Sequence, residues 1–257
     1  MEAPSPLSTH HRFTFDHETL TRLWPQLHAG DAEPLPQDAP CLEAWRLCHE
    51  GDFEAAARLG RQAGPQGQVA AHRALFMQAA YLELHEKTRL DMLEALARQA
   101  GEQARAHPEC AGAWYWQAAA LGRYGQGISV AKALAQGLGE KVRSGFERAI
   151  ELQPRHADAH LGLGAFHAEV IDKVGEMIGK MTYGASRDTG LRMFREGLRL
   201  NPSSPLGLLE TGHGLLMLQG DQAREQAARL YEQALAFEPQ DAINALVLQR
   251  VRAELQD

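Results

Sequence analysis

Three histidines fall on one stripe of an expected helix and are the first candidates for chemistry. His156, His160 and His167 stand at i, i+4 and i+11, a spacing that places their imidazoles on one side of an α-helix. Three imidazoles on one face could bind a metal such as zinc. His160 and His167, however, also occupy the two aromatic positions of a helical repeat described below, so packing accounts for both. We therefore expect no metal site: replacing His160 should destabilise the fold, and replacing His156 should be silent.

The other reactive side chains form no catalytic pattern. The chain has only three cysteines, which suits reduced thiols rather than a disulfide framework, and no further ligands stand at zinc spacing. A glycine-rich stretch at residues 122–132 ends in a lysine, but its spacing does not match a phosphate-binding loop. We expect no catalytic residue, no cofactor and no enzymatic activity. His10, His11 and His17 lie in an expected N-terminal tail and suggest at most adventitious metal binding. The cysteines are Cys41, Cys48 and Cys110.

The composition is that of an ordinary globular chain and excludes several classes of protein. The 257 residues are 44% hydrophobic and 23% charged, which argues against wholesale disorder. The net charge of −7 leaves no basic excess to neutralise phosphates, so a nucleic-acid partner is not expected. No secretory signal and no apolar run of about 18 residues is seen, so we expect a cytoplasmic protein without a transmembrane segment.

Four prolines end similar phrases and indicate a helical repeat. Pro108, Pro154, Pro202 and Pro239 close the phrases ARAHP, IELQP, LRLNP and AFEP. Measured from these prolines, three successive units match the 34-residue tetratricopeptide repeat (TPR) pattern, in which small residues let two antiparallel helices approach closely. In the clearest unit the matching residues are Leu208, Thr211, Gly212, Leu215, Ala227, Tyr231 and Ala234. The pattern predicts an all-α solenoid of TPR-like hairpins.

The expected organisation has two parts. Residues 1–37 are expected to form a partly mobile N-terminal tail with a short helix, and residues 38–257 the TPR-like α-solenoid. A C-terminal capping helix is expected at residues 241–257, because repeat arrays need a polar end. The predicted hairpins span about residues 38–64, 68–107, 109–153, 155–201 and 203–238.

Two insertions distinguish this chain from ordinary repeats. The proline intervals are 46, 48 and 37 residues, so the first two exceed the 34-residue period by 12 and 14. Apolar residues recur at helical spacing inside both, which favours two extended hairpin arms over long loops. The arms are expected to pack on each other, either as a local core or as a wall that lines or gates a pocket. The arm-lining residues are Ile128, Leu134, Leu138, Val174, Met177, Ile178 and Met181.

The insertions also carry a family resemblance. Residues 114–202, which begin WYWQAAALGRYG and end MFREGLRLNP, resemble the regulator of microtubule dynamics family, a set of TPR-like proteins with bacterial relatives. The likeness covers roughly residues 70–240 and includes both arms. It implies a TPR-like repeat domain, and lipid binding is reported for animal members of that family.

The first helices of the hairpins are expected to line a concave groove. Its stripe is apolar and lacks the Lys, Arg and Asn with which TPR domains clamp peptide carboxylates, so acidic C-terminal tails are not the expected ligand. An apolar groove needs a cover, which could be the chain's own terminal segment, an amphipathic partner helix or an acyl chain. The predicted groove residues are Tyr115, Ala119, Leu161, Ala165, Leu209, His213 and Leu216.

The resulting functional hypothesis is a non-catalytic scaffold that binds an unknown protein or peptide partner in this groove. The alternative is binding or carriage of a lipid or other hydrophobic small molecule in the groove and between the arms. A metal-dependent enzyme on the histidine stripe is the least favoured interpretation.

Overall fold

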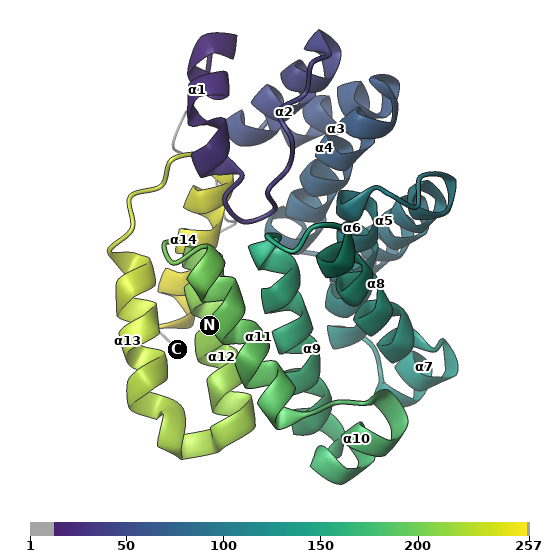
Figure 1. The fold of residues 1–257 in the computed structure, drawn as a ribbon, viewed down its shortest axis with the longest axis vertical. Helices are drawn as coiled ribbons and strands as arrows, with labels where there is room; N and C mark the ends of the chain where they lie inside the picture. Colours follow the sequence, from purple (N-terminus) through teal and green to yellow (C-terminus); the bar gives the residue numbers. More distant parts are fainter. Residues whose placement is uncertain (1–12, 256–257) are drawn as a thin grey trace.

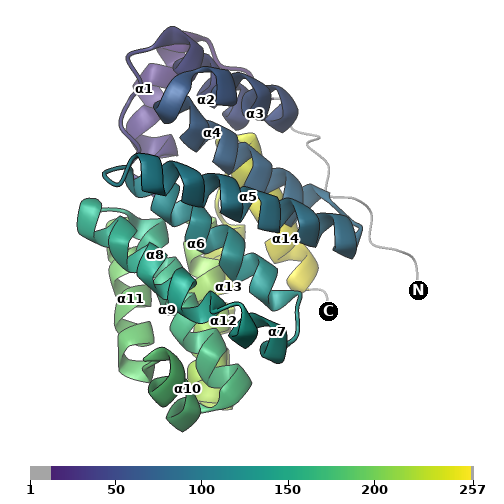
Figure 2. The same cartoon turned by 90° about the vertical axis from the view of Figure 1, so that its right-hand side faces the viewer.

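Helices form every regular element in the computed structural model, which describes residues 13–255 (Figures 1 and 2). The inner helices are α2 (Ala39–Glu50), α4 (Gly64–Met77), α6 (Ala111–Gln126), α9 (Ala157–Val174), α12 (Pro205–Gln219) and α14 (Ala242–Glu254). The outer helices are α3 (Phe53–Gln62), α5 (Glu86–Ala106), α8 (Leu138–Leu152), α11 (Arg187–Leu200) and α13 (Arg224–Leu235). The remaining elements are α1 (His17–Leu27), α7 (Val130–Ala135), α10 (Glu176–Tyr183), the short π-helix η1 (Gln78–Leu82) and the short 3₁₀-helix η2 (Gly220–Ala223). The expected all-α class is confirmed.

The repeat prolines end the outer helices as the pattern predicts. Helices α5, α8 and α11 each end two residues before their prolines, Pro108, Pro154 and Pro202. Proline cannot continue a helix, so the chain turns there and starts the next inner helix. Ser204 then caps α12, because its hydroxyl accepts a hydrogen bond from the amide of Gly207 at 3.0 Å. Local chemistry therefore sets the alternation of inner and outer helices.

The hairpins curve until the two ends of the array meet. The inner helices contact one another in the order α2, α4, α6, α9, α12 and α14, and α14 returns to α2. Each outer helix lies behind this ring; α8, for example, packs on both α6 and α9. Figure 1 shows the ring with the C-terminal helix α14 beside the N-terminal helices. The inner helices consequently form a closed ring around the concave face.

The linker between α1 and α2 enters this interior. In Figure 1 it descends into the middle of the ring before it rises to α2. The carbonyl of Gly30 accepts a hydrogen bond from the amide of Asp158 at 3.0 Å, and Ala32 accepts one from the Gln153 side chain. The indole of Trp24 donates to the Glu33 carbonyl at 2.8 Å. The chain's own N-terminal segment thus covers part of the concave face.

A chain of buried polar contacts joins the two ends of the ring. Asp241 contacts His49 at 2.7 Å, and the two Nε2 atoms of His49 and His28 are 3.1 Å apart. His28 then contacts Asp31 at 2.9 Å, and Asp31 pairs with Arg73 of α4 at 2.7 Å. The contacts run from the C-terminal helix cap through α2 and the linker to α4, so they tie three parts of the ring together.

The two insertions are helical, as expected, but neither simply lengthens a hairpin helix. The first contains the separate helix α7, and the second contains α10. Gly137 precedes α8 at φ +63°, and Gly175 separates α9 from α10 at φ +82°. These left-handed conformations suit glycine and interrupt a continuous helix. The arms touch where the Tyr183 ring at the end of α10 lies against Gly139 at the start of α8.

Candidate functional site

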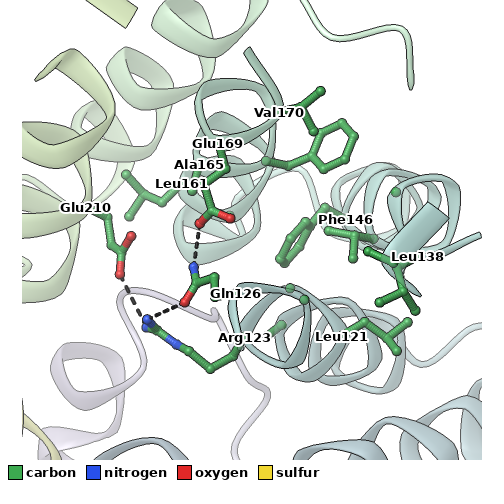
Figure 3. A pocket seen from close by; sticks show the side chains of 18 of the residues that line it. Leu121, Arg123, Gln126, Leu138, Phe146, Leu161, Ala165, Glu169, Val170 and Glu210 are labelled. Carbon is green, nitrogen blue, oxygen red and sulfur yellow. Dashed lines mark hydrogen bonds and ion pairs between the residues drawn. The ribbon is translucent and has the colours of Figure 1, made fainter. Parts of the chain in front are cut away.

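A pocket lies between the inner helices α6 and α9, and its volume is about 1240 Å³ when the open solvent at its mouth is included. Helix α8 closes it from behind, and residues of α7, α10 and α12 complete its border. Figure 3 shows apolar side chains along one side and a polar chain along the other. The apolar wall is formed by Leu121, Leu138, Val142, Phe146, Leu161 and Val170.

Phe146 of the outer helix α8 contributes a large part of this wall. Its ring lies so close to Gly162 of α9 that an added Cβ would be 2.5 Å from the ring. The ring centroids of Phe146 and Tyr115 of α6 are 5.8 Å apart. The phenylalanine therefore lies against both inner helices, and the missing side chain at residue 162 provides the room that its ring needs.

The polar side is a chain of four residues from three helices (Figure 3). Arg123 lies 3.6 Å from the carboxylate of Glu210 and donates to Gln126 at 3.0 Å. Gln126 in turn donates to Glu169 at 2.5 Å. Burial raises the pKa of Glu169, although the hydrogen bond from Gln126 opposes this shift. The chain joins α6 to α9 and α12 and forms a polar edge to an otherwise apolar pocket.

Asp158 lies where the linker closes one end of the pocket. Its side chain is enclosed by the protein but keeps part of its surface toward the pocket. Its carboxylate makes no hydrogen bond or ion pair with any residue in the described part of the chain. Burial and the nearby Asp31 raise its pKa to about 7, and Arg73 opposes this rise. The pocket therefore contains an acidic group without a local partner.

The structure brings five of the seven predicted groove residues to this region. Four of them line the main pocket, and His213 lines a smaller hollow that shares Arg123 with it. Leu209 is buried in the core instead, and Leu216 is half-buried outside both hollows. The four that line the main pocket are Tyr115, Ala119, Leu161 and Ala165.

The predicted arm residues separate into three groups. Leu138 and Val174 line the pocket, and Ile128 is half-buried against the core. The other four point to solvent at the outer ends of the arms. Leu134 and Ile178 are about half exposed, at 53% and 52%, while Met177 and Met181 are more so, at 74% and 82%.

The histidine stripe has structural contacts in this fold. His160 reaches the carbonyl of Pro154 at 3.1 Å, and His167 accepts a hydrogen bond from the amide of Ser186 at 3.3 Å. His156 caps α9 by accepting a hydrogen bond from the amide of Ala159 at 3.1 Å, and it is buried. The expectation that replacing His156 would be silent is therefore wrong, because a buried helix cap stabilises the fold.

No group of three metal-ligating side chains gathers within the described residues. Among these residues there is also no helix that is both long enough and apolar enough to cross a membrane. His10 and His11 lie outside the described residues, while His17 pairs with Glu43 at 3.1 Å.

Sequence reasoning missed the polar side of the pocket. The predicted groove residues include none of its members, which are Arg123, Gln126, Asp158, Glu169 and Glu210. The one available signal was the presence of Asp158 and Glu169 in a helix whose other charged residues, Asp172 and Lys173, stand together at its C-terminal end. That signal does not show which charges find partners, since the partners of Glu169 come from another helix.

Comparison with known proteins supports the fold and no narrower identity. No family model and no curated protein matches this sequence. The structure is similar to the crystal structure of TTC0263, a thermophilic TPR protein in Thermus thermophilus, with a TM-score of 0.56 and 19% sequence identity. The match covers 85% of this chain and 98% of the other. At this identity it shows a TPR-like fold, and it does not confirm the regulator of microtubule dynamics family.

Proposed function

We propose that this protein is a non-catalytic TPR-like scaffold that binds an apolar segment of a protein partner at the arms and the adjoining pocket. One observation carries the proposal: of the eight large apolar side chains that are exposed in the described residues, five belong to α7 and α10. A concentration of exposed apolar residues marks an interaction surface, and methionine adapts its shape to a partner. The five are Val130, Leu134, Met177, Ile178 and Met181.

The charges around this surface favour an acidic partner. The chain has a net charge of −7 and only five lysines. Four of the five, Lys132, Lys141, Lys173 and Lys180, lie on or next to the arms. Basic groups that surround an apolar patch attract a partner with acidic residues around its own apolar face. An acidic amphipathic helix fits this description.

Site-specific photo-crosslinking of the full chain tests this proposal. A photoreactive amino acid at Met181, which is 82% exposed at the tip of α10, should crosslink to a discrete protein partner in cells. The same amino acid at Glu54, whose side chain is 85% exposed on the outer helix α3, is the control. Adducts that are the same at both positions, or absent at Met181, would overturn the proposal.

The enclosed apolar wall supports a second candidate, a hydrophobic small molecule. Backed by α8, the pocket has the mostly apolar lining with a few polar groups that is typical of small-molecule sites. The sequence resemblance to the regulator of microtubule dynamics family points in the same direction, since lipid binding is reported for animal members. We propose this ligand class for the pocket alone, whereas the protein partner also needs the arms.

Substitution inside the pocket separates the two candidates. Gly122 lines the pocket, and the nearest atom to an added Cβ is 3.9 Å away, so Gly122→Leu should fill space without a clash. Native mass spectrometry and solvent extraction should recover a bound small molecule from the wild-type protein and not from this variant. Recovery of the same amount from both proteins, or from neither, would overturn the second candidate.

A further inference from the structure

The acidic group at the linker end of the pocket differs from its buried neighbours. Asp31 pairs with Arg73 at 2.7 Å, and Asp241 contacts His49 at 2.7 Å. Asp158 has no such contact among the described residues, although it lies in the first turn of α9 beside these groups. An enclosed carboxylate without a partner is costly. Its partner is therefore expected to come from outside the chain, through the pocket that it borders.

Aromatic side chains line the pocket that Asp158 borders. Tyr115 lies near Asp158, and its ring centroid is 5.8 Å from that of Phe146. Tyr81 and Phe76 line the pocket as well. The electron-rich faces of such rings attract organic cations, particularly where water is excluded. A carboxylate beside several aromatic rings is a suitable receptor for a positively charged nitrogen.

The remaining chemistry selects the kind of cation. A primary ammonium has three N–H groups that each need an acceptor, whereas the side chains that line the pocket are mostly apolar or aromatic. A fully alkylated ammonium has no N–H group and is satisfied by charge and by aromatic faces. The apolar wall continues along α9 from Asp158 to Val170, a span of about 18 Å at the helical rise. An alkyl chain fits beside that wall.

We propose that the pocket binds an amphiphile whose quaternary ammonium group lies against Asp158 and Tyr115 and whose alkyl chain follows the apolar wall. The inference rests on the proposed role of the pocket as a ligand site and specifies the chemistry of its ligand. The ammonium group could belong to a free small molecule or to a lipid headgroup, and the recognition chemistry is the same in both.

Titration calorimetry of the full chain at pH 8 tests the inference with three probes that share a decyl chain. These are decyltrimethylammonium, decyl sulfate and decyl maltoside, each below its micellar concentration. We expect the cation to bind at least about tenfold more tightly than the other two, since a desolvated cation–π contact and a charge pair are each sufficient for such a ratio. Asp158→Asn should remove this preference and leave maltoside binding within about twofold.

A matched carboxylate serves as the control. Asp188 occupies the same position in the first turn of α11 but is exposed, so Asp188→Asn should leave all three affinities unchanged. Release of phosphatidylcholine from vesicles to the wild-type protein, and not to Asp158→Asn, would assign the ammonium group to a lipid headgroup.

The outcomes distinguish a failure of the cation inference from a failure of the proposed small-molecule site. If all three decyl probes bind equally and Asp158→Asn has no effect, the pocket is a ligand site but the cation inference is wrong. If none of the probes binds, or if Gly122→Leu binds them as well as the wild type does, the pocket is not their site. Both the small-molecule candidate and the cation inference then fail.

Discussion

The buried contact between Asp241 and His49 should be one of the main interactions that hold the ring closed, and Asp241→Ala tests this expectation. Asp241 accepts a hydrogen bond from the amide of Asn244 at 2.7 Å and so caps α14. Its other oxygen contacts His49 of α2, and both side chains are almost fully buried. Burial alone would raise the pKa of Asp241, but His49, the amide of Asn244 and the charge of Arg73 together outweigh it, and the pKa lies below its ordinary value. The ionised carboxylate therefore stabilises the fold at neutral pH.

The proton positions explain why one residue should matter this much. Nδ1 of His49 faces Asp241, and Nδ1 of His28 faces Asp31, so both atoms are assigned as donors. The contact between the two Nε2 atoms then requires one extra proton. Burial lowers the pKa of His28 to about 4. Asp241→Ala removes the carboxylate that contacts this histidine pair and leaves a buried ring nitrogen of His49 without its partner.

The expected loss combines two effects. Removal of a helix cap costs about 1 kcal/mol, and removal of the charged partner of a buried hydrogen bond costs about 3 kcal/mol. The free energy of unfolding should therefore fall by about 4 kcal/mol. Asp52→Ala is the matched control, because Asp52 caps α3 through the amide of Ala55 but is exposed. That variant should lose only the cap, about 1 kcal/mol.

Urea denaturation followed by circular dichroism at pH 7 measures both variants. Hydrogen exchange should show in addition that protection is lost first in α14 and α2, where the ring opens. Equal losses in the two variants would refute the idea that the buried contact closes the ring. A loss in Asp241→Ala below about 1.5 kcal/mol would refute it as well.

Other substitutions test the packing and electrostatics of the pocket region. Asp158→Asn should raise the free energy of unfolding of the empty protein by about 1–2 kcal/mol at pH 8 and not at pH 4. The sign follows from the pKa of Asp158, which is about 7 in the folded protein and 3.8 ordinarily. Ionisation of Asp158 in the folded protein therefore lowers stability, and this loss grows as the pH rises between these two values and is complete above them. An equal effect of Asp158→Asn at both pH values would contradict this account. Gly214→Ala should cost about 1–3 kcal/mol in thermal unfolding, because the added Cβ would meet the ring of Phe194. Gly122→Ala, whose added Cβ would be in ordinary contact with Val142 at 3.9 Å, should be neutral or stabilising, and similar melting temperatures for the two variants would refute the packing argument. His156→Ala should cost about 1–2 kcal/mol in urea denaturation, and a silent substitution would mean that the cap on α9 is dispensable.

The spacing of residues was enough to predict the fold class and the ends of three outer helices. Pro108, Pro154 and Pro202 act locally, since proline ends a helix whatever surrounds it. The insertions were predicted as apolar helical segments for a similar reason. The division of the insertions into separate helices was not predicted. Gly175 is present in the sequence, but the left-handed φ that it adopts depends on where the following segment packs.

The residues of the candidate site also divide into those that the sequence predicted and those that it did not. Tyr115, Ala119, Leu161 and Ala165 were found from the register of each inner helix alone, because a helix turns at a fixed pitch. Leu209 occupies the same register but is buried in the core. Register identifies the inward face of a helix, but it does not tell what lies opposite that face.

The sequence by itself determined the all-α repeat and the apolar character of the inner face, since these follow from short-range steric and hydrophobic patterns. Only the tertiary structure decided that the ring closes, that the linker enters it and that the Asp158 carboxylate makes no hydrogen bond or ion pair with another of the described residues. Closure depends on small rotations that accumulate from one hairpin to the next. Whether a charge is paired depends on residues far away in the chain. His49 and Asp241 are 192 positions apart, and the sequence around either residue does not predict their contact.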